Sequence, residues 1–292
     1  MAVFRTFLFA PANHPRRVEK SFTLGADAVI LDLEDACAVS EKVASRAKVV
    51  EAFSQPQPCL KYVRVNPLGT EFSFGDFHAV VSEGLDGIVL PKVESASDLI
   101  TAEWVLSNLE REKGLPVGGI DLMPIIETGL GIANLRSILA APSRVKRVAF
   151  GAGDFCLDMN LQWTQSEEEL LAYRSRIVML SRAAGKEAPI DTVWINIHDT
   201  EGFAASAQRS RQLGFQGKLC IYPDQVPVVN DVFTPTAEQV ARARRVVEAF
   251  AEAEAQGSSS FQLDGQFIDY PIVYAAEKLL QIHEKVNGQR QG

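Results

Sequence analysis

Short apolar runs along this chain alternate with longer segments in which apolar residues recur every three or four positions. This alternation predicts parallel strands joined by crossover helices. Eight runs predict strands, at Thr6–Ala10, Ala28–Leu33, Lys61–Val65, Gly87–Leu90, Leu122–Ile126, Arg147–Phe150, Thr192–Ile195 and Lys218–Ile221. The helical spacing is clearest at Ser40–Phe53, Ala96–Lys113, Glu167–Ala184 and Glu201–Leu213.

Eight strands with intervening helices predict an α/β fold, a TIM (β/α)8 barrel. An open doubly wound sheet is the alternative, but the turn after the first run reads APANHPRR and lacks the glycine-rich dinucleotide fingerprint. We predict that the barrel domain covers residues 1–234 and that a C-terminal helix lies within 235–256.

Residues 257–292 are predicted to form a linker and a C-terminal extension. An Asp264-Gly265 turn separates two short extended runs, and a helix is expected to start near Pro271. We do not expect a unit this small to bury its own apolar face. It should therefore pack on the barrel or on a neighbouring subunit.

Composition narrows the class of function. The chain has 29 Lys and Arg against 37 Asp and Glu, a net charge of -8, which argues against a nucleic-acid surface. The apolar run near the N-terminus is too short for a signal peptide or a membrane span, so we expect a cytoplasmic protein. Four widely spaced cysteines are expected to be reduced thiols.

The polar residues that follow the apolar runs share one expected position. The C-terminal ends of barrel strands form one rim, where barrel enzymes carry their chemistry. The most prominent polar residues at these ends are Asp32, Glu34, Asp35, Arg64, Lys92, Glu94, Glu127 and Asp154. We therefore expect carboxylates, an arginine and a lysine around one mouth.

Glu127 and Asp154 follow neighbouring strands and suit a hard divalent cation such as Mg²⁺, with Mn²⁺ as an alternative. Zinc is disfavoured because no His or Cys cluster lies nearby. The competing interpretation is that each carboxylate caps the helix that follows it. The glycines beside them leave room for a ligand to approach the backbone.

Asp32, Glu34 and Asp35 place three carboxylates in four positions, where unpaired buried charge is costly. A hydrated metal or an arginine would compensate them, and ion pairs with Lys42 and Arg46 are the alternative. The four histidines show no ligand spacing, so we do not expect the catalytic base to be histidine.

Arg64 interrupts an apolar run, and a guanidinium at the rim is a suitable partner for a substrate carboxylate or a developing enolate oxygen. Pairing with Asp32 or Glu34 is the alternative, and both interactions are compatible. Lys92 is similarly open to pairing with Glu94.

Several segments, taken in order, resemble one known family: RTFLFAPANHPRR, AVILDLEDA, VRVN, GIVLPKVES, PIIETGLG, FGAGDF, GKLCIYPDQ and DGQFIDYPIVY. The chain is similar to the citrate lyase β subunit and to the malyl-CoA and citramalyl-CoA lyases of the HpcH/HpaI aldolase superfamily. Cys37 and Tyr222 depart from the pattern common in that family.

The resemblance assigns roles to individual residues. It implies that Glu127 and Asp154 bind the metal and that Glu34 and Asp35 organise the metal and its waters. Arg64 is implied to contact the reacting oxygens of the substrate. Residues implied or proposed to line the substrate and CoA site are Phe9, Arg16, Arg17, Arg64 and Lys92.

Asp269 matches an aspartate on the C-terminal extension of the family's acyl-CoA lyases. That aspartate donates or accepts a proton and often acts in the active site of a neighbouring subunit. Asp264 does not match it and is predicted to be a turn residue.

The activity implied is Mg²⁺-dependent cleavage of a 3-hydroxyacyl-CoA of the citramalyl, malyl or citryl type, with CoA as part of the substrate. Retro-Claisen chemistry would yield acetyl-CoA and a 2-oxo acid, and the resemblance implies a homo-oligomer, a trimer or a hexamer. The alternatives are a citrate lyase β subunit acting on an acyl carrier protein thioester, a class II pyruvate aldolase, and a non-catalytic binding protein.

Overall fold

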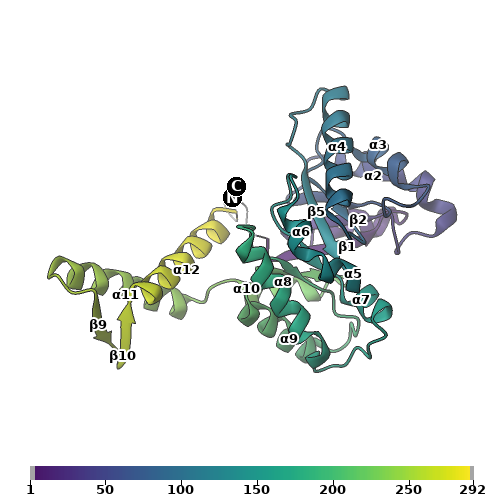
Figure 1. Cartoon of the computed structure of the whole chain (residues 1–292). Helices are drawn as coiled ribbons and strands as arrows, with labels where there is room; N and C mark the ends of the chain where they lie inside the picture. The colour runs from purple at the N-terminus through teal and green to yellow at the C-terminus, as the bar shows by residue number, and fades with distance from the viewer. Residues whose placement is uncertain (1–3, 290–292) are drawn as a thin grey trace. The chain divides into compact units, whose positions relative to one another are not determined.

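A computed structural model describes residues 4–289, so the outermost residues of the predicted domain ranges, 1–3 and 290–292, lie outside the described residues. Eight parallel strands form a closed barrel in chain order, which confirms the predicted TIM barrel (Figure 1). The strands are β1 Thr6–Pro11, β2 Ala28–Asp32, β3 Leu60–Arg64, β4 Gly87–Leu90, β5 Asp121–Ile126, β6 Ala149–Phe150, β7 Ile190–Asp191 and β8 Gly217–Cys220.

Helices follow the strands and lie around the outside of the barrel (Figure 1). They are α1 Pro15–Ser21, α2 Lys42–Phe53, α3 Ser73–Val80, α4 Ala96–Glu112, α5 Gly129–Ala133, α6 Leu135–Ala140, α7 Ala152–Asp158, α8 Leu171–Ala183, α9 Thr200–Leu213 and α10 Gln225–Phe233. All four helices predicted from apolar spacing are present. A short 3-10 turn precedes α2 at Val39–Glu41 and α8 at Glu168–Leu170.

The predicted seventh strand is wrong in position. The strand is Ile190–Asp191, not Thr192–Ile195, and it pairs with β6 through Ile190 and with β8 through both of its residues. The hydroxyl of Thr192 then accepts a hydrogen bond from the backbone N–H of Ala152 at 2.8 Å, outside the strand ladder. The apolar run that follows is therefore a loop at the rim, and Ile195 is 63% exposed.

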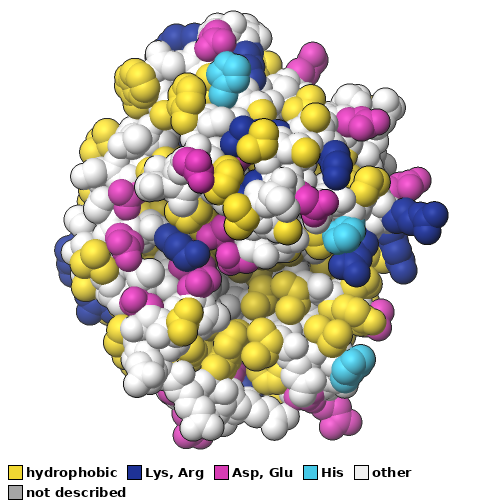
Figure 2. Space-filling view, turned by 90° about the vertical axis from the view of Figure 1, so that its right-hand side faces the viewer, with side chains coloured by type: hydrophobic (Ala, Val, Ile, Leu, Met, Phe, Trp, Pro, Cys, Tyr) yellow, Lys and Arg dark blue, Asp and Glu magenta, His cyan; other side chains and the backbone are white. Residues whose placement is uncertain are grey.

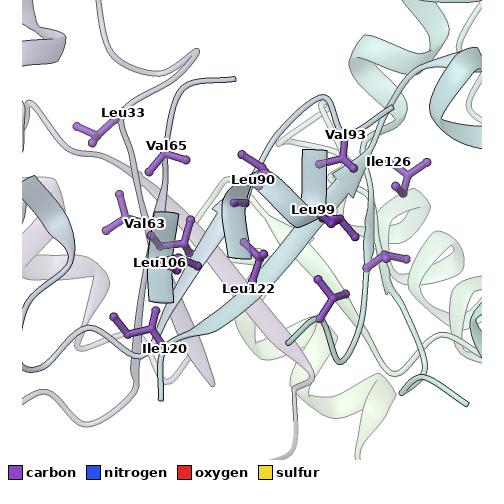
Figure 3. Close-up of a cluster of buried hydrophobic side chains, with 14 of the residues drawn as sticks. Leu33, Val63, Val65, Leu90, Val93, Leu99, Leu106, Ile120, Leu122 and Ile126 are labelled. Carbon is purple, nitrogen blue, oxygen red and sulfur yellow. The ribbon is translucent and has the colours of Figure 1, made fainter. Parts of the chain in front are cut away.

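The main hydrophobic core lies between the strands and the helices. Figure 3 shows part of it, in which side chains from β3, β4 and β5 pack against Leu99 and Leu106 of α4. The opposite faces of the strands fill the barrel interior, where the ring of Tyr62 lies against Gly87, and a Cβ at Gly87 would lie 2.1 Å from that ring. Burial on both faces explains why these strands appear in the sequence as nearly continuous apolar runs.

A buried ion network joins β7 and β8 to the helices α8 and α9. Asp191 accepts hydrogen bonds from Lys218 at 2.7 Å and from Arg174 at 2.9 Å. Arg174 also binds Glu167 at 2.8 Å, and both Asp191 and Lys218 are fully buried. Because buried charges are stable only when paired, this network ties the strands to their covering helices.

The chain divides after Asn230 into two units, and each is described by itself. In the second unit, α11 Ala237–Ala255, the hairpin of β9 Ser260–Leu263 and β10 Gln266–Asp269, and α12 Tyr270–Gln289 are present. The hairpin turns at Asp264-Gly265, as predicted, with φ of +50° and +77°.

As expected, the extension does not bury its apolar face alone, and the partner on which it packs within the second unit is α11. The hairpin and α12 pack with α11, and their buried side chains form one cluster: Ala243, Val246, Phe250, Ile268, Val273 and Ala276. Phe250 contacts the ring of Tyr270 edge-on, with centroids 4.9 Å apart. None of the helices that the structure describes between residues 4 and 289 is both long and apolar enough to span a membrane.

We predict that Asp191→Asn destabilises the protein by about 3–5 kcal/mol, because it leaves the buried ammonium of Lys218 without its countercharge. Urea unfolding at pH 7 measures the loss. The matched control is Asp264→Asn, whose ion pair with Arg245 is exposed, so its loss costs about 1 kcal/mol or less.

The loss of stability in Asp191→Asn should depend on pH. Burial acts to raise the pKa of Asp191, but Lys218 and Arg174 hold it well below its usual value. A carboxylate with a depressed pKa stabilises the fold above its unfolded pKa and loses that contribution as the pH falls. The difference between wild type and Asp191→Asn should therefore begin to shrink below about pH 4. A difference that grows in acid would contradict this account.

Candidate active site

The structure brings most of the predicted site residues together at the C-terminal rim of the barrel. Asp32 ends β2, Arg64 ends β3, and Lys92 follows β4. Glu127 follows β5, and Asp154 lies in the first turn of α7 after β6. Because these strands are parallel neighbours, residues far apart in the sequence meet in one place.

Arg64 is the central cation of this site. Its Nε and Nη2 donate to the two oxygens of Asp32 at 2.7 and 2.6 Å, a bidentate pair. Its Nη1 lies 2.8 Å from Glu34 and 3.6 Å from Asp35. The guanidinium also stacks on Phe9, 4.8 Å from the ring centroid. The predicted alternative, pairing with Asp32 or Glu34, is therefore confirmed for both residues.

The pKa values of Asp32 and Glu34 are shifted in opposite directions. Burial acts to raise the pKa of Asp32, but Arg64 and two backbone N–H groups hold it below its usual value. Burial also raises the pKa of Glu34, and there the opposing effect of Arg64 and Lys92 is too small to reverse the shift. Asp32 is thus held as an anion that fixes Arg64.

Lys92 contacts three of the acids through two different groups. Its ammonium lies 2.9 Å from Glu34 and 3.8 Å from Asp154, and its backbone N–H donates to Glu127 at 2.8 Å. The suggested Lys92–Glu94 pair is not found among residues 4–289, where the backbone N–H of Glu94 instead donates to Asp98.

Glu127 is a buried carboxylate without an ion pair of its own in the described part of the chain. Burial, together with the charges of Glu34 and Asp154, raises its pKa to about 8, although Arg64 and the N–H of Lys92 oppose the shift. A divalent cation held by Glu127 and Asp154 would relieve this imbalance, so the donor set fits a hard metal that takes one or two carboxylates. No group of three or more His, Cys, Asp or Glu side chains arranged for a metal occurs within residues 4–289.

The helix-capping alternative does not hold for either Glu127 or Asp154. Thr128 caps α5, and its hydroxyl accepts from the N–H of Gly131 at 3.0 Å, which leaves Glu127 free of that task. Gly151 is the N-cap residue of α7, and no side chain caps that end. Asp154 instead lies inside the first turn, where a negative charge is favoured by the helix dipole.

The alternative interpretation, in which Lys42 and Arg46 pair with the side chains of Asp32, Glu34 and Asp35, is wrong. The buried ammonium of Lys42 donates to the carbonyls of Leu33 and Glu34 at 2.9 and 2.6 Å and to Asn66 at 2.7 Å. Arg46 pairs with Asp76 at 2.8 Å. Sequence reasoning missed this role of Lys42, which holds the backbone of the loop that carries Glu34.

Three further predicted residues belong to other parts of the chain, two to α1 and one to the second unit. Arg16 and Arg17 are exposed on α1 and form no ion pair with any other residue of the described range. Asp269 ends β10 in the second unit and is half-buried. Their roles stay predictions.

A cavity of about 170 Å³ opens beside Lys92, between the loops that follow β3 and β4. Its lining includes Pro67, Gly69, Pro91 and Glu94. Figure 2 shows acidic and basic side chains next to one another near the middle of the face that it draws, above a hollow lined by hydrophobic side chains.

We predict that Gly151→Ala displaces Glu127 and weakens divalent-metal binding at least about tenfold. A Cβ at Gly151 would lie 2.5 Å from Oε2 and 2.7 Å from Cβ of Glu127. Titration calorimetry with MgCl2 measures the affinity. The control is Gly153→Ala, whose Cβ would meet only Trp163 at 3.9 Å, and equal affinities for the two variants would contradict the steric argument.

Comparisons with known proteins agree on one family. A family model described as HpcH/HpaI aldolase/citrate lyase matches residues 5–223. Citrate lyase subunit beta from Leuconostoc mesenteroides subsp. cremoris is 38% identical over 280 residues, which cover 95% of this chain and 92% of that protein. L-malyl-CoA/beta-methylmalyl-CoA lyase from Cereibacter sphaeroides is 32% identical over 305 residues, covering 97% and 95%.

A solved structure shows the same fold over almost the whole chain. The crystal structure of protein CitE from Mycobacterium tuberculosis, in complex with magnesium, acetoacetate and coenzyme A, is 29% identical with a TM-score of 0.79. The match covers 97% of this chain and 99% of that one. This chain therefore belongs to the HpcH/HpaI aldolase/citrate lyase family and is a carbon–carbon lyase.

Proposed function

We propose that this protein is a Mg²⁺-dependent lyase that cleaves a 3-hydroxyacyl thioester into an acetyl thioester and a 2-oxo acid. The observation that carries the proposal is the rim cluster, in which Arg64 and Lys92 lie among the carboxylates of β2, β5 and β6. The crystal structure of the similar CitE protein with magnesium, acetoacetate and coenzyme A supports this choice of metal and substrate class.

In this proposal Glu127 and Asp154 hold the magnesium ion, and Glu34 and Asp35 organise the water around it. When bound, the ion supplies Lewis-acid chemistry, which favours ionisation of the substrate hydroxyl and stabilises the oxo acid that forms. The protein fixes Glu127 in advance, because the N–H of Lys92 and the missing Cβ of Gly151 define where the Glu127 carboxylate lies.

Arg64 stabilises the negative charge that develops on the thioester oxygen as the carbon–carbon bond breaks. Its bidentate contact with Asp32 and its stacking on Phe9 hold the guanidinium in place before the substrate arrives. Little reorganisation is then needed in the transition state. Arg16 and Arg17 are exposed cations on α1 that suit the phosphate groups of CoA.

Asp269 completes the reaction by donating a proton to the enolate carbon, and it is the base in the condensing direction. It ends the β10 strand immediately before α12, so its backbone is fixed by the hairpin ladder through its pairing with Ser260. The substrate hydroxyl loses its proton to water, and Asp269, after giving its proton to carbon, regains one from water, so no net proton is gained or lost.

Two related activities differ from this one in their substrates or their products. A citrate lyase β subunit acts on a thioester of an acyl carrier protein, and the 38% identical relative carries that subunit name. A pyruvate aldolase of the same family would release no acetyl-CoA. We favour free CoA thioesters because the structure of the similar CitE protein holds coenzyme A and the match to the malyl-CoA/β-methylmalyl-CoA lyase covers 97% of this chain.

We predict that the purified protein cleaves at least one of citramalyl-CoA, malyl-CoA and citryl-CoA in MgCl2 and loses at least about 99% of this activity in EDTA. Release of acetyl-CoA, measured by liquid chromatography, is the readout. Matched carrier-protein thioesters are assayed in parallel. Cleavage of carrier thioesters alone would identify a subunit activity, and cleavage of none would overturn the proposal.

We further predict that Asp269→Asn lowers kcat by about 10²–10⁴-fold while Mg²⁺ affinity stays unchanged, because only proton transfer is lost. Asp264→Asn, in the same hairpin but at the turn, is the control and should keep wild-type turnover. Circular dichroism checks that both variants fold. Wild-type turnover by Asp269→Asn would leave the extension with a structural role alone.

A further inference from the structure

We propose that Lys92 is a built-in cation that occupies the carboxylate site and competes with the divalent metal for it. Its removal should therefore tighten metal binding. This inference rests on the proposed function in one respect, namely that Glu127 and Asp154 hold the metal. It changes the predicted role of Lys92 from a substrate-binding residue to a positioning residue.

The backbone at Lys92 is fixed in an uncommon conformation. Its φ is +53°, a left-handed value that residues with a Cβ adopt only at an energetic cost. The N–H of Lys92 donates to Glu127, and the next N–H, that of Val93, donates to the carbonyl of Ile125 in β5. A glycine would adopt this backbone more easily, so the presence of lysine indicates that its side chain has a task.

That side chain supplies positive charge where the acids lack it. The ammonium lies 2.9 Å from Glu34 and 3.8 Å from Asp154. Arg64 is already engaged with Asp32, Glu34 and Asp35. Lys92 is thus the ion-pair partner of Asp154 among residues 4–289, and the backbone contact of the same residue holds Glu127.

The charge balance makes competition the expected outcome. Among residues 4–289, five carboxylates meet at this rim, and the cations that pair with them are Arg64 and Lys92. A metal that binds Asp154 brings a second positive charge next to the Lys92 ammonium, which lies 3.8 Å from Asp154 Oδ1. The side chain of Lys92 is 36% exposed, so it has room to withdraw while its backbone N–H still holds Glu127. The ammonium therefore stabilises the metal-free site and opposes metal entry.

The test is titration of the full chain with MgCl2 by calorimetry. Lys92→Asn removes the charge but keeps a residue that tolerates the left-handed backbone. We expect its Mg²⁺ dissociation constant to fall roughly five- to tenfold, as loss of one nearby like charge implies. Lys92→Arg keeps the charge and should stay within about twofold of wild type.

Lys146→Asn is the matched control for net charge. Lys146 also faces a carboxylate, with its ammonium 4.0 Å from Asp121, but Asp121 begins β5 and lies at the opposite rim of the barrel. Over that distance salt screens the charge, so the dissociation constant should change by less than about twofold.

A second readout separates competition from simple structural support. Without metal, Lys92→Asn should melt at a lower temperature than wild type, and saturating MgCl2 should raise its melting temperature by more than that of wild type. If Lys92→Asn does not fold, Lys92→Gly, which suits positive φ, takes its place in both measurements.

The outcomes distinguish this inference from the proposed function. If wild type binds Mg²⁺ and Lys92→Asn binds it equally or more weakly, the competition is refuted and the proposed lyase stands. If wild type itself binds no Mg²⁺, both fail together. Tighter binding by Lys92→Asn that is also seen with Lys146→Asn would reflect net charge alone and would refute a specific role for Lys92.

Discussion

The structure depends on how a closed barrel gathers negative charge and compensates it. Parallel strands end at one rim, so the carboxylates that follow β2, β5 and β6 are brought together irrespective of their distance in the sequence. Burial makes each uncompensated charge costly. Arg64 meets this demand for Asp32 and Glu34, and Lys92 meets it for Glu34 and Asp154. Glu127 is left with a backbone N–H and a raised pKa.

Much of the barrel was predictable because its strands are buried on both faces. The run Gly87–Leu90, for example, has no polar side chain and is bounded by Asp86 and Pro91, and seven of the eight strands overlap their predicted ranges. The seventh strand does not, because it has only two residues and one of them is the charged Asp191. That aspartate is stable only through Lys218 and Arg174, which come from β8 and α8, and a local pattern carries no information about such distant partners.

In the candidate site, too, some features could be predicted from the sequence and others could not. The types and order of Asp32, Arg64, Glu127 and Asp154 could be predicted, because strand ends in a barrel share one rim. Their partners could not. The positive φ of Lys92 and the turn of the Lys42 ammonium toward the carbonyls of Leu33 and Glu34 depend on how separate loops pack, which a residue pattern alone does not specify.

The two cations of the rim consequently have different duties. Arg64 is planar, bidentate with Asp32, stacked on Phe9 and nearly buried, so its position is set by several contacts at once. A charge held in this way is preorganised, which is the property that stabilises a developing anion. Lys92 has a flexible side chain, partly exposed, on a backbone that is itself pinned to Glu127 and β5. The fixed cation is suited to the transition state, whereas the movable one is suited to an exchange with another cation.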